Sequence, residues 1–165
     1  NDNELVESQA GEVLFSEQGL SGICIMQLSR LLSKCHGNLE IGLDLLEEFN
    51  ESEVNILLEE RLKKYGNYYL EGIFNDKLAK VLVNVDNLKD IRFKIVGTYD
   101  YTKAQVMHGG VSLEEVDENL ECTKYPGIYI AGEVLDVDGD CGGYNLHFAF
   151  ASGYHIAKTI LSKGK

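Results

Sequence analysis

The sequence has no tryptophan, one proline, and only 15 lysines and arginines against 27 acidic residues. The formal net charge of −12 argues against nucleic-acid binding, which requires clustered basic side chains. That charge gives no attraction to anionic membranes, and no apolar run approaches the roughly 20 residues of a membrane helix. The polar, acidic start at residues 1–11 is unlike a signal peptide. We therefore expect neither a nucleic-acid nor a membrane partner.

The cysteines are few and scattered: Cys24, Cys35, Cys122 and Cys141 form no C-x-x-C pair and show no metal-ligand spacing. A reducing, cytoplasmic location is the simplest interpretation. Cys141 lies in a glycine-rich loop, where we favour a plain small residue over a redox thiol because no second cysteine is near it in the sequence.

The dinucleotide-binding motif G-x-G-x-x-G is also missing. That motif normally follows an early strand and opens a helix that holds the pyrophosphate. The Gly19–Gly22 segment does not fit it and is predicted to be a turn. If the chain takes part in dinucleotide binding, the segment that grips the adenine half lies outside it, and we expect a C-terminal fragment.

The pattern in residues 1–98 predicts short strands and helices. Strands are expected at 11–15, 39–45 and 91–98, and a helix at 22–34 with Ser21 as its cap. Asn50 and Glu53 form a capping box for a second helix that ends near Gly66. A third helix is predicted at 69–84, so that residues 50–84 form a helical hairpin whose apolar faces are core.

The Gly109–Gly110 pair indicates either a bulge or a close approach of the backbone to another group. A return strand is predicted just before it, at 104–107. His108 is the one histidine that we consider as a proton donor, and an ordinary histidine at a strand end is the alternative.

Residues 126–153 carry the main functional signal. They predict a turn at Pro126, a buried strand at 128–131, a glycine-rich acidic loop, and a helix opening at Tyr144. Free backbone N–H groups at such a helix start suit an anion or cofactor, although a purely structural loop has the same pattern. The apolar stripe predicted for this helix consists of Leu146, Ala149, Phe150, Gly153, Ile156, Ala157, Ile160 and Leu161.

Three aspartates in that loop, Asp136, Asp138 and Asp140, raise the question of calcium. Counted from Asp136, an EF-hand requires glycine at the sixth position and glutamate at the twelfth, where this chain has Cys141 and His147. We therefore predict no metal.

The amino-acid sequences of several segments closely resemble those of one family. Residues 129–139 and 142–146, YIAGEVLDVDG and GGYNL, are similar to the C-terminal signature of the BaiN-like (YhiN-like) bacterial flavoproteins, also called the aminoacetone-oxidase-like FAD-binding family. Residues 11–22, 104–113 and 125–127 match in the same order. The family usually has a proline near Ile23, which is absent here. The resemblance covers nearly the whole chain but less than half of a family member.

The resemblance implies an NAD(P)/FAD-dependent oxidoreductase and an α+β fold. Residues 1–98 would be an inserted domain of strands and a helical hairpin, and 99–165 the return strand and the C-terminal strand–loop–helix of a Rossmann-like FAD domain. FAD would bind the intact protein, not this fragment alone, together with the missing N-terminal segment, a small-molecule substrate and NAD(P)H. The cofactor-binding residues implied are Gly132, Glu133, Gly142, Gly143, Tyr144 and Asn145.

Two alternatives remain at this point. In the first alternative, the chain folds around its helical hairpin and is a non-catalytic interaction module, or a lid, within a larger protein. The glycine loop also suits an independent small-ligand binder. The sequence does not decide the substrate.

Overall fold

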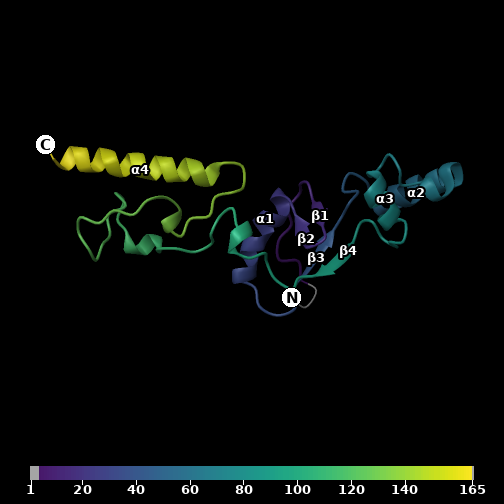
Figure 1. Cartoon of the computed structure of the whole chain (residues 1–165), viewed down its shortest axis with the longest axis horizontal. Coiled ribbons are helices and arrows are strands. Elements are labelled where there is room, and N and C mark those ends of the chain that lie inside the picture. The colour runs from purple at the N-terminus through teal and green to yellow at the C-terminus, as the bar shows by residue number, and fades with distance from the viewer. Residues whose placement is uncertain (1–3, 165) are drawn as a thin grey trace. The chain divides into compact units, whose positions relative to one another are not determined.

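The computed structural model describes residues 4–164, which combine helices with two small antiparallel sheets (Figure 1). This content agrees with the expected α+β class. Contacts divide the chain into two compact units: residues 37–96 form one, and residues 4–36 with 97–164 form the other. The assignment of 1–98 as an inserted domain stays a prediction, since these contacts group residues 4–36 with the C-terminal part.

The 37–96 unit contains a two-stranded sheet in which β3 (Glu40–Leu43) pairs with β4 (Ile91–Lys94). Ile41 lies opposite Phe93 in this antiparallel register. The strands predicted at 39–45 and 91–98 are confirmed, with shorter bounds.

Helix α2 (Glu51–Tyr65) begins with the predicted capping box: Asn50 accepts from the backbone N–H of Glu53, and the Glu53 side chain accepts from that of Asn50. Helix α3 (Asp76–Leu82) is shorter than the predicted helix at 69–84, because Asn75 caps it. The core between these helices consists of Leu46, Val54, Leu70, Ala79, Leu82 and Leu88.

The segment before α3 is held in turns by Arg61. Its guanidinium donates to the carbonyls of Tyr69 (2.6 Å) and Glu71 (2.5 Å), which follow the short 3-10 helix η2 (Gly66–Tyr68). Those carbonyls therefore accept from a side chain and not from a helical N–H, which explains why α3 begins at Asp76 and not at residue 69 as predicted.

In the other unit, β1 (Leu14–Ser16) and β2 (Gly19–Ser21) form a hairpin that precedes α1 (Ile23–Ser29) and the 3-10 helix η1 (Arg30–Ser33). The turn predicted at 19–22 is wrong, because residues 19–21 form β2 and pair with β1. The capping role of Ser21 is also wrong: Ser21 pairs with Leu14, and Gly22 is the N-cap.

Residues 97–143 are mostly irregular, with three short 3-10 helices: η3 (Tyr101–Lys103), η4 (Leu113–Glu115) and η5 (Gly132–Val134). The strand predicted at 104–107 does not form. The strand at 128–131 is reduced to a single bridge from Tyr129 to Glu121, and Ile128 is half exposed. A buried strand needs neighbours on both edges, and the described residues supply only this bridge.

Helix α4 (Tyr144–Lys163) begins where predicted and runs beside η5 (Figure 1). Its packed side centres on Ser152, which is buried and whose hydroxyl accepts the backbone N–H of Gly132 (3.0 Å). The predicted apolar stripe is not buried, since Leu146 and Phe150 are largely exposed. Among residues 4–164, no helix has the length and apolar character needed to cross a membrane.

The last turn of α4 is anchored by Glu121. This carboxylate accepts from the Lys163 ammonium (2.5 Å), the backbone N–H of Gly127 (2.7 Å) and the Tyr129 hydroxyl (2.9 Å). These donors, Lys163 first, lower the pKa of Glu121 to about 2. Because the charged form is the one stabilised, the carboxylate favours the folded state.

We expect acid to loosen this anchor. A carboxylate whose pKa is lowered on folding contributes stability above its unfolded value, near 4.5, and loses it as pH falls toward about 2. Glu121→Gln should therefore flatten the decline in stability between these pH values, measured by denaturant unfolding at each pH. Glu114→Gln, an exposed carboxylate without these donors, is the matched control. A Glu121→Gln profile that parallels the parent profile would contradict the assignment.

Candidate functional site

Two segments that are far apart in the sequence, residues 107–111 and 133–138, lie side by side in the structure. We call this pairing the ladder. The backbone N–H of Val111 donates to the carbonyl of Val134 (2.7 Å), and that of Asp136 donates to the carbonyl of Val111 (2.9 Å). The ladder therefore brings the segment of the candidate proton donor against the start of the candidate cofactor loop.

Close packing at Gly110 and Leu135 makes this pairing possible. Leu135 is only 1% exposed. A Cβ at Gly110 would lie 2.5 Å from the carbonyl oxygen of Val134 and 2.9 Å from the carbonyl carbon of Leu135. Such distances exclude any side chain at Gly110 without movement of the backbone. Of the two interpretations of Gly109–Gly110, the close approach is confirmed at Gly110, and the group approached is the ladder's own backbone.

Glu133, the residue that the family resemblance assigns to the flavin, has a structural partner as well. Its Oε1 accepts the backbone N–H of Met107 (2.6 Å), which ties the beginning of the ladder. Within residues 4–164, its Oε2 has no hydrogen-bond partner, so one oxygen is available to a hydroxyl donor. Glu133 can therefore brace the ladder and accept a bond from a ligand at once.

Gly132 acts through its lack of a side chain. Its φ of +70° lies in the left-handed region that favours glycine, and a Cβ there would lie 3.4 Å from that of Ala149 in α4. Its N–H is already bound by Ser152. Gly132 thus brings η5 against α4, and its N–H is not offered to a cofactor.

The side chain of Asn145 closes the glycine loop, residues 139–143. Its Oδ1 accepts the N–H of Gly139 (2.8 Å), and its Nδ2 donates to the carbonyl of the same residue (3.0 Å). Gly142 and Gly143 have φ values of +120° and +101°, and no atom lies within 4 Å of a Cβ built on either. The loop is thus pinned at one end and open at the other.

The open end carries the amide site, which we define as the backbone N–H groups of Gly143, Tyr144 and Asn145. No protein acceptor lies on these groups within the part of the chain that the structure describes, and α4 has no side-chain cap. The positive end of the helix dipole adds to them. Free donors beside open space fit the electron-rich pyrimidine edge of a flavin, so the residues present are compatible with FAD.

His108 lies against Asp138, thirty positions further along the chain. Nδ1 of the imidazole is hydrogen-bonded to the Asp138 carboxylate, and the two side chains are 32% and 19% exposed. Asp136 is the third group here: one polar atom from each of the three residues lies within 4.8 Å of the others. The expectation of no metal stays a prediction. The sequence singled out His108, but no local signal paired it with Asp138.

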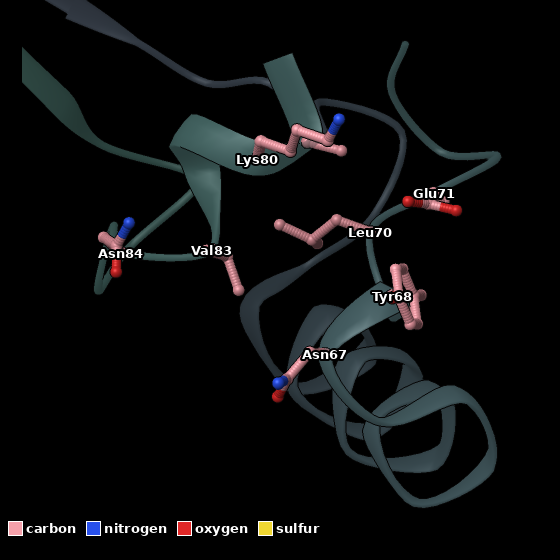
Figure 2. A pocket seen from close by; sticks show the side chains of 8 residues that line it. Asn67, Tyr68, Leu70, Glu71, Lys80, Val83 and Asn84 are labelled. Atoms are coloured by element: carbon pink, nitrogen blue, oxygen red, sulfur yellow. The ribbon is translucent and has the colours of Figure 1, made fainter. Parts of the chain in front are cut away.

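Two cavities lie in the 37–96 unit and contain none of the predicted site residues. The smaller is about 250 Å³. The larger, about 360 Å³, is lined by both polar and apolar side chains around Leu70 (Figure 2). Its other lining residues are Asn67, Tyr68, Glu71, Ala79, Lys80, Val83 and Asn84.

Comparison with known proteins now identifies the class. The model of the HI0933-like protein Rossmann domain matches residues 21–159, and the chain belongs to this family. The resemblance found in the sequence is thereby confirmed. The fold is of a Rossmann-related family, although the arrangement of its domains in this chain stays a prediction.

Among the relatives is the 3-dehydro-bile acid delta(4,6)-reductase of Clostridium scindens, 32% identical over 97% of this chain and 46% of that protein. The ribosomal RNA dihydrouridine synthases of Haemophilus influenzae and Escherichia coli are 32% and 28% identical, over 90% and 91% of this chain and 42% of each protein. The family therefore includes oxidoreductases. The chain spans less than half the length of these relatives.

A methyl group at Gly110 should open the ladder. Gly110→Ala forces the backbone at Val134 and Leu135 to move, at a cost of about 1–3 kcal/mol. Hydrogen exchange in the intact protein should then lose protection at the amides of Val111 and Asp136. Gly153→Ala is the control: its Cβ would meet nothing within 4 Å, and alanine favours a helix by up to about 1 kcal/mol. Equal protection in both variants would refute the close approach.

Proposed function

We propose that the intact protein carrying this chain is an FAD-dependent reductase of carbon–carbon double bonds conjugated to a carbonyl group. The observation that carries the proposal is the ladder, which joins His108, Glu133 and the loop before the amide site within one compact unit. The proposed cofactor surface and the pair formed by His108 and Asp138 thereby belong to one compact unit.

The names of the relatives support this reaction class. A delta(4,6)-reductase of a 3-dehydro bile acid acts on double bonds that extend from a ketone. Dihydrouridine is uridine whose C5–C6 double bond, conjugated to the C4 carbonyl, has been reduced. Both products follow from hydride addition at the carbon β to a carbonyl and proton addition at the α carbon. We propose the same addition for the protein that carries this chain.

The residues named by the family resemblance would divide the work on FAD. The amide site would face the pyrimidine edge and stabilise negative charge there. Oε2 of Glu133 would accept from a ribityl hydroxyl, as suits a carboxylate. Gly142 would leave room for the ring, while Gly132 and the Asn145 side chain hold the loop against α4. When bound, FAD supplies the hydride, and NAD(P)H is the proposed reductant.

Charge favours a small molecule as substrate. The chain carries −12 overall, and an RNA substrate would bring many phosphates near it. Between the substrates in the relatives' names, we therefore propose a small unsaturated carbonyl compound.

For residues 37–96 we propose a supporting role as a lid or an interaction module. The unit has its own core around Leu70 and Leu82, and it contains no residue of the ladder or the amide site.

The purified intact protein should contain about one FAD per chain. NAD(P)H should bleach the flavin without oxygen, and an α,β-unsaturated ketone should restore its colour and yield the saturated product. A saturated ketone of the same skeleton is the control, and uridine-containing RNA tests the other substrate class. Absence of flavin from the intact protein would refute the proposed function. Flavin that reoxidises with RNA and not with the enone would overturn the choice of substrate.

Loss of the Glu133 carboxylate should weaken FAD binding. Glu133→Ala removes the acceptor for a ribityl hydroxyl and the brace on Met107. A hydrogen bond to a charged group contributes about 1.5–3 kcal/mol, so the Kd for FAD should rise by about tenfold to a hundredfold. Flavin released on dilution measures the change, with Glu114→Ala as the matched control. Unaltered occupancy would remove Glu133 from the cofactor site.

A further inference from the structure

The contact between His108 and Asp138 gives the imidazole a defined orientation. Nδ1 points to a carboxylate that is only 19% exposed, while Nε2 has no hydrogen-bond partner among residues 4–164. A carboxylate accepts and never donates when ionised, so Nδ1 must carry a proton. Nε2 is then the nitrogen that exchanges a proton with another molecule.

The backbone on both sides of His108 is fixed. Met107 is held through its N–H by Glu133, and Val111 pairs with residues 134–136. The imidazole is thus carried on a five-residue segment, 107–111, whose two ends are both hydrogen-bonded to residues 133–136. The orientation of the imidazole depends on Asp138, which lies at the end of the paired segment 133–138.

Asp138 in turn is joined to the amide site. The residue after it, Gly139, exchanges two hydrogen bonds with the side chain of Asn145 in the first turn of α4. Fixed contacts therefore run from His108 through Asp138 and Gly139 to the helix start that offers free N–H groups. The titratable pair and the proposed flavin surface are held by one loop.

We propose that His108 is the proton donor of the reduction and that Asp138 is its positioning residue; this rests on the proposed function. Bound reduced FAD would supply the hydride that the β carbon of the substrate gains. The π-electron pair of the double bond takes the proton from Nε2 of the imidazolium at the α carbon. The substrate thus gains two hydrogen atoms, His108 becomes neutral, and solvent reprotonates its partly exposed ring. NAD(P)H would supply the electrons that return FAD to its reduced form.

Asp138 acts here through the imidazole and not on the substrate. Its carboxylate keeps the proton on Nδ1 and stabilises the positive charge before transfer, as a buried carboxylate does for a histidine in hydrolases. Asp136 belongs to the same cluster, since one polar atom of its side chain lies within 4.8 Å of those of His108 and Asp138.

Rapid-mixing kinetics of the intact protein separate the two half-reactions. General acid catalysis contributes about 10²–10⁴-fold, so His108→Gln should slow reoxidation by the enone at least a hundredfold. Flavin reduction by NAD(P)H and FAD content should stay as in the parent. Asp138→Asn should slow the same step, and the pH-dependent limb of that step should disappear in His108→Gln. His155→Gln, a histidine bonded to the carbonyl of Glu118, is the matched control.

Nitrogen NMR of the imidazole tests Asp138 independently of turnover. His108 should show the Nδ1–H tautomer in the parent, and Asp138→Asn should shift it to Nε2–H. An unchanged tautomer overturns the positioning role, and normal reoxidation in His108→Gln overturns the donor role.

A tautomer signal that changes on addition of Zn²⁺, or enone reduction that is lost with a chelator, overturns the pairing of His108 with Asp138 in favour of a cation site. A parent protein with FAD that reduces no enone refutes the proposed function instead, while the tautomer still decides the orientation.

Discussion

The backbone pairing of Val111 with residues 134–136 is the constraint on which the candidate site depends. Neither segment belongs to a regular strand or an α-helix, so without this pairing little would set where His108 and Glu133 lie. Two backbone hydrogen bonds and the burial of Leu135 supply the order that a sheet would otherwise give. The absence of a side chain at Gly110 is what lets the two backbones meet.

Polar contacts hold helix α4 against the same segment. Ser152 binds the N–H of Gly132, and Asn145 holds Gly139 at the other end of the 132–139 segment. Glu121 anchors the last turn through Lys163. These contacts satisfy backbone groups that irregular structure leaves without partners, and they fix the start of the helix, where the free N–H groups lie.

Local signals in the sequence predicted local structure well. The capping box at Asn50 needs only Glu53, and the start of α4 needs only the glycines before it, so both were confirmed. The strands at 104–107 and 128–131 were wrong because apolar composition indicates burial but does not identify a partner. The predicted burial of the apolar stripe of α4 was wrong for a similar reason. The helical period identified an apolar face, but the helix packs through the face that carries Ser152 and Asn145.

The candidate site was predictable in part for the same reason. The glycine loop and His108 could be recognised from the sequence alone, and the residues of the signature at 129–139 and 142–146 identified the family. The pairing of His108 with Asp138 spans thirty positions and exists only because the ladder sets the register between two irregular segments. No spacing rule connects residues across such a distance.

The ladder also bears on how this chain can change over evolutionary time. At residues 107 and 111 it is held by backbone groups, which any amino acid other than proline provides. The side chain at position 108 takes no part in those bonds. Mutation can therefore exchange the side chain at this position while the surrounding backbone stays as it is. A scaffold of this kind lets descendants differ in the side chain at position 108 without rebuilding the loop that leads to the amide site.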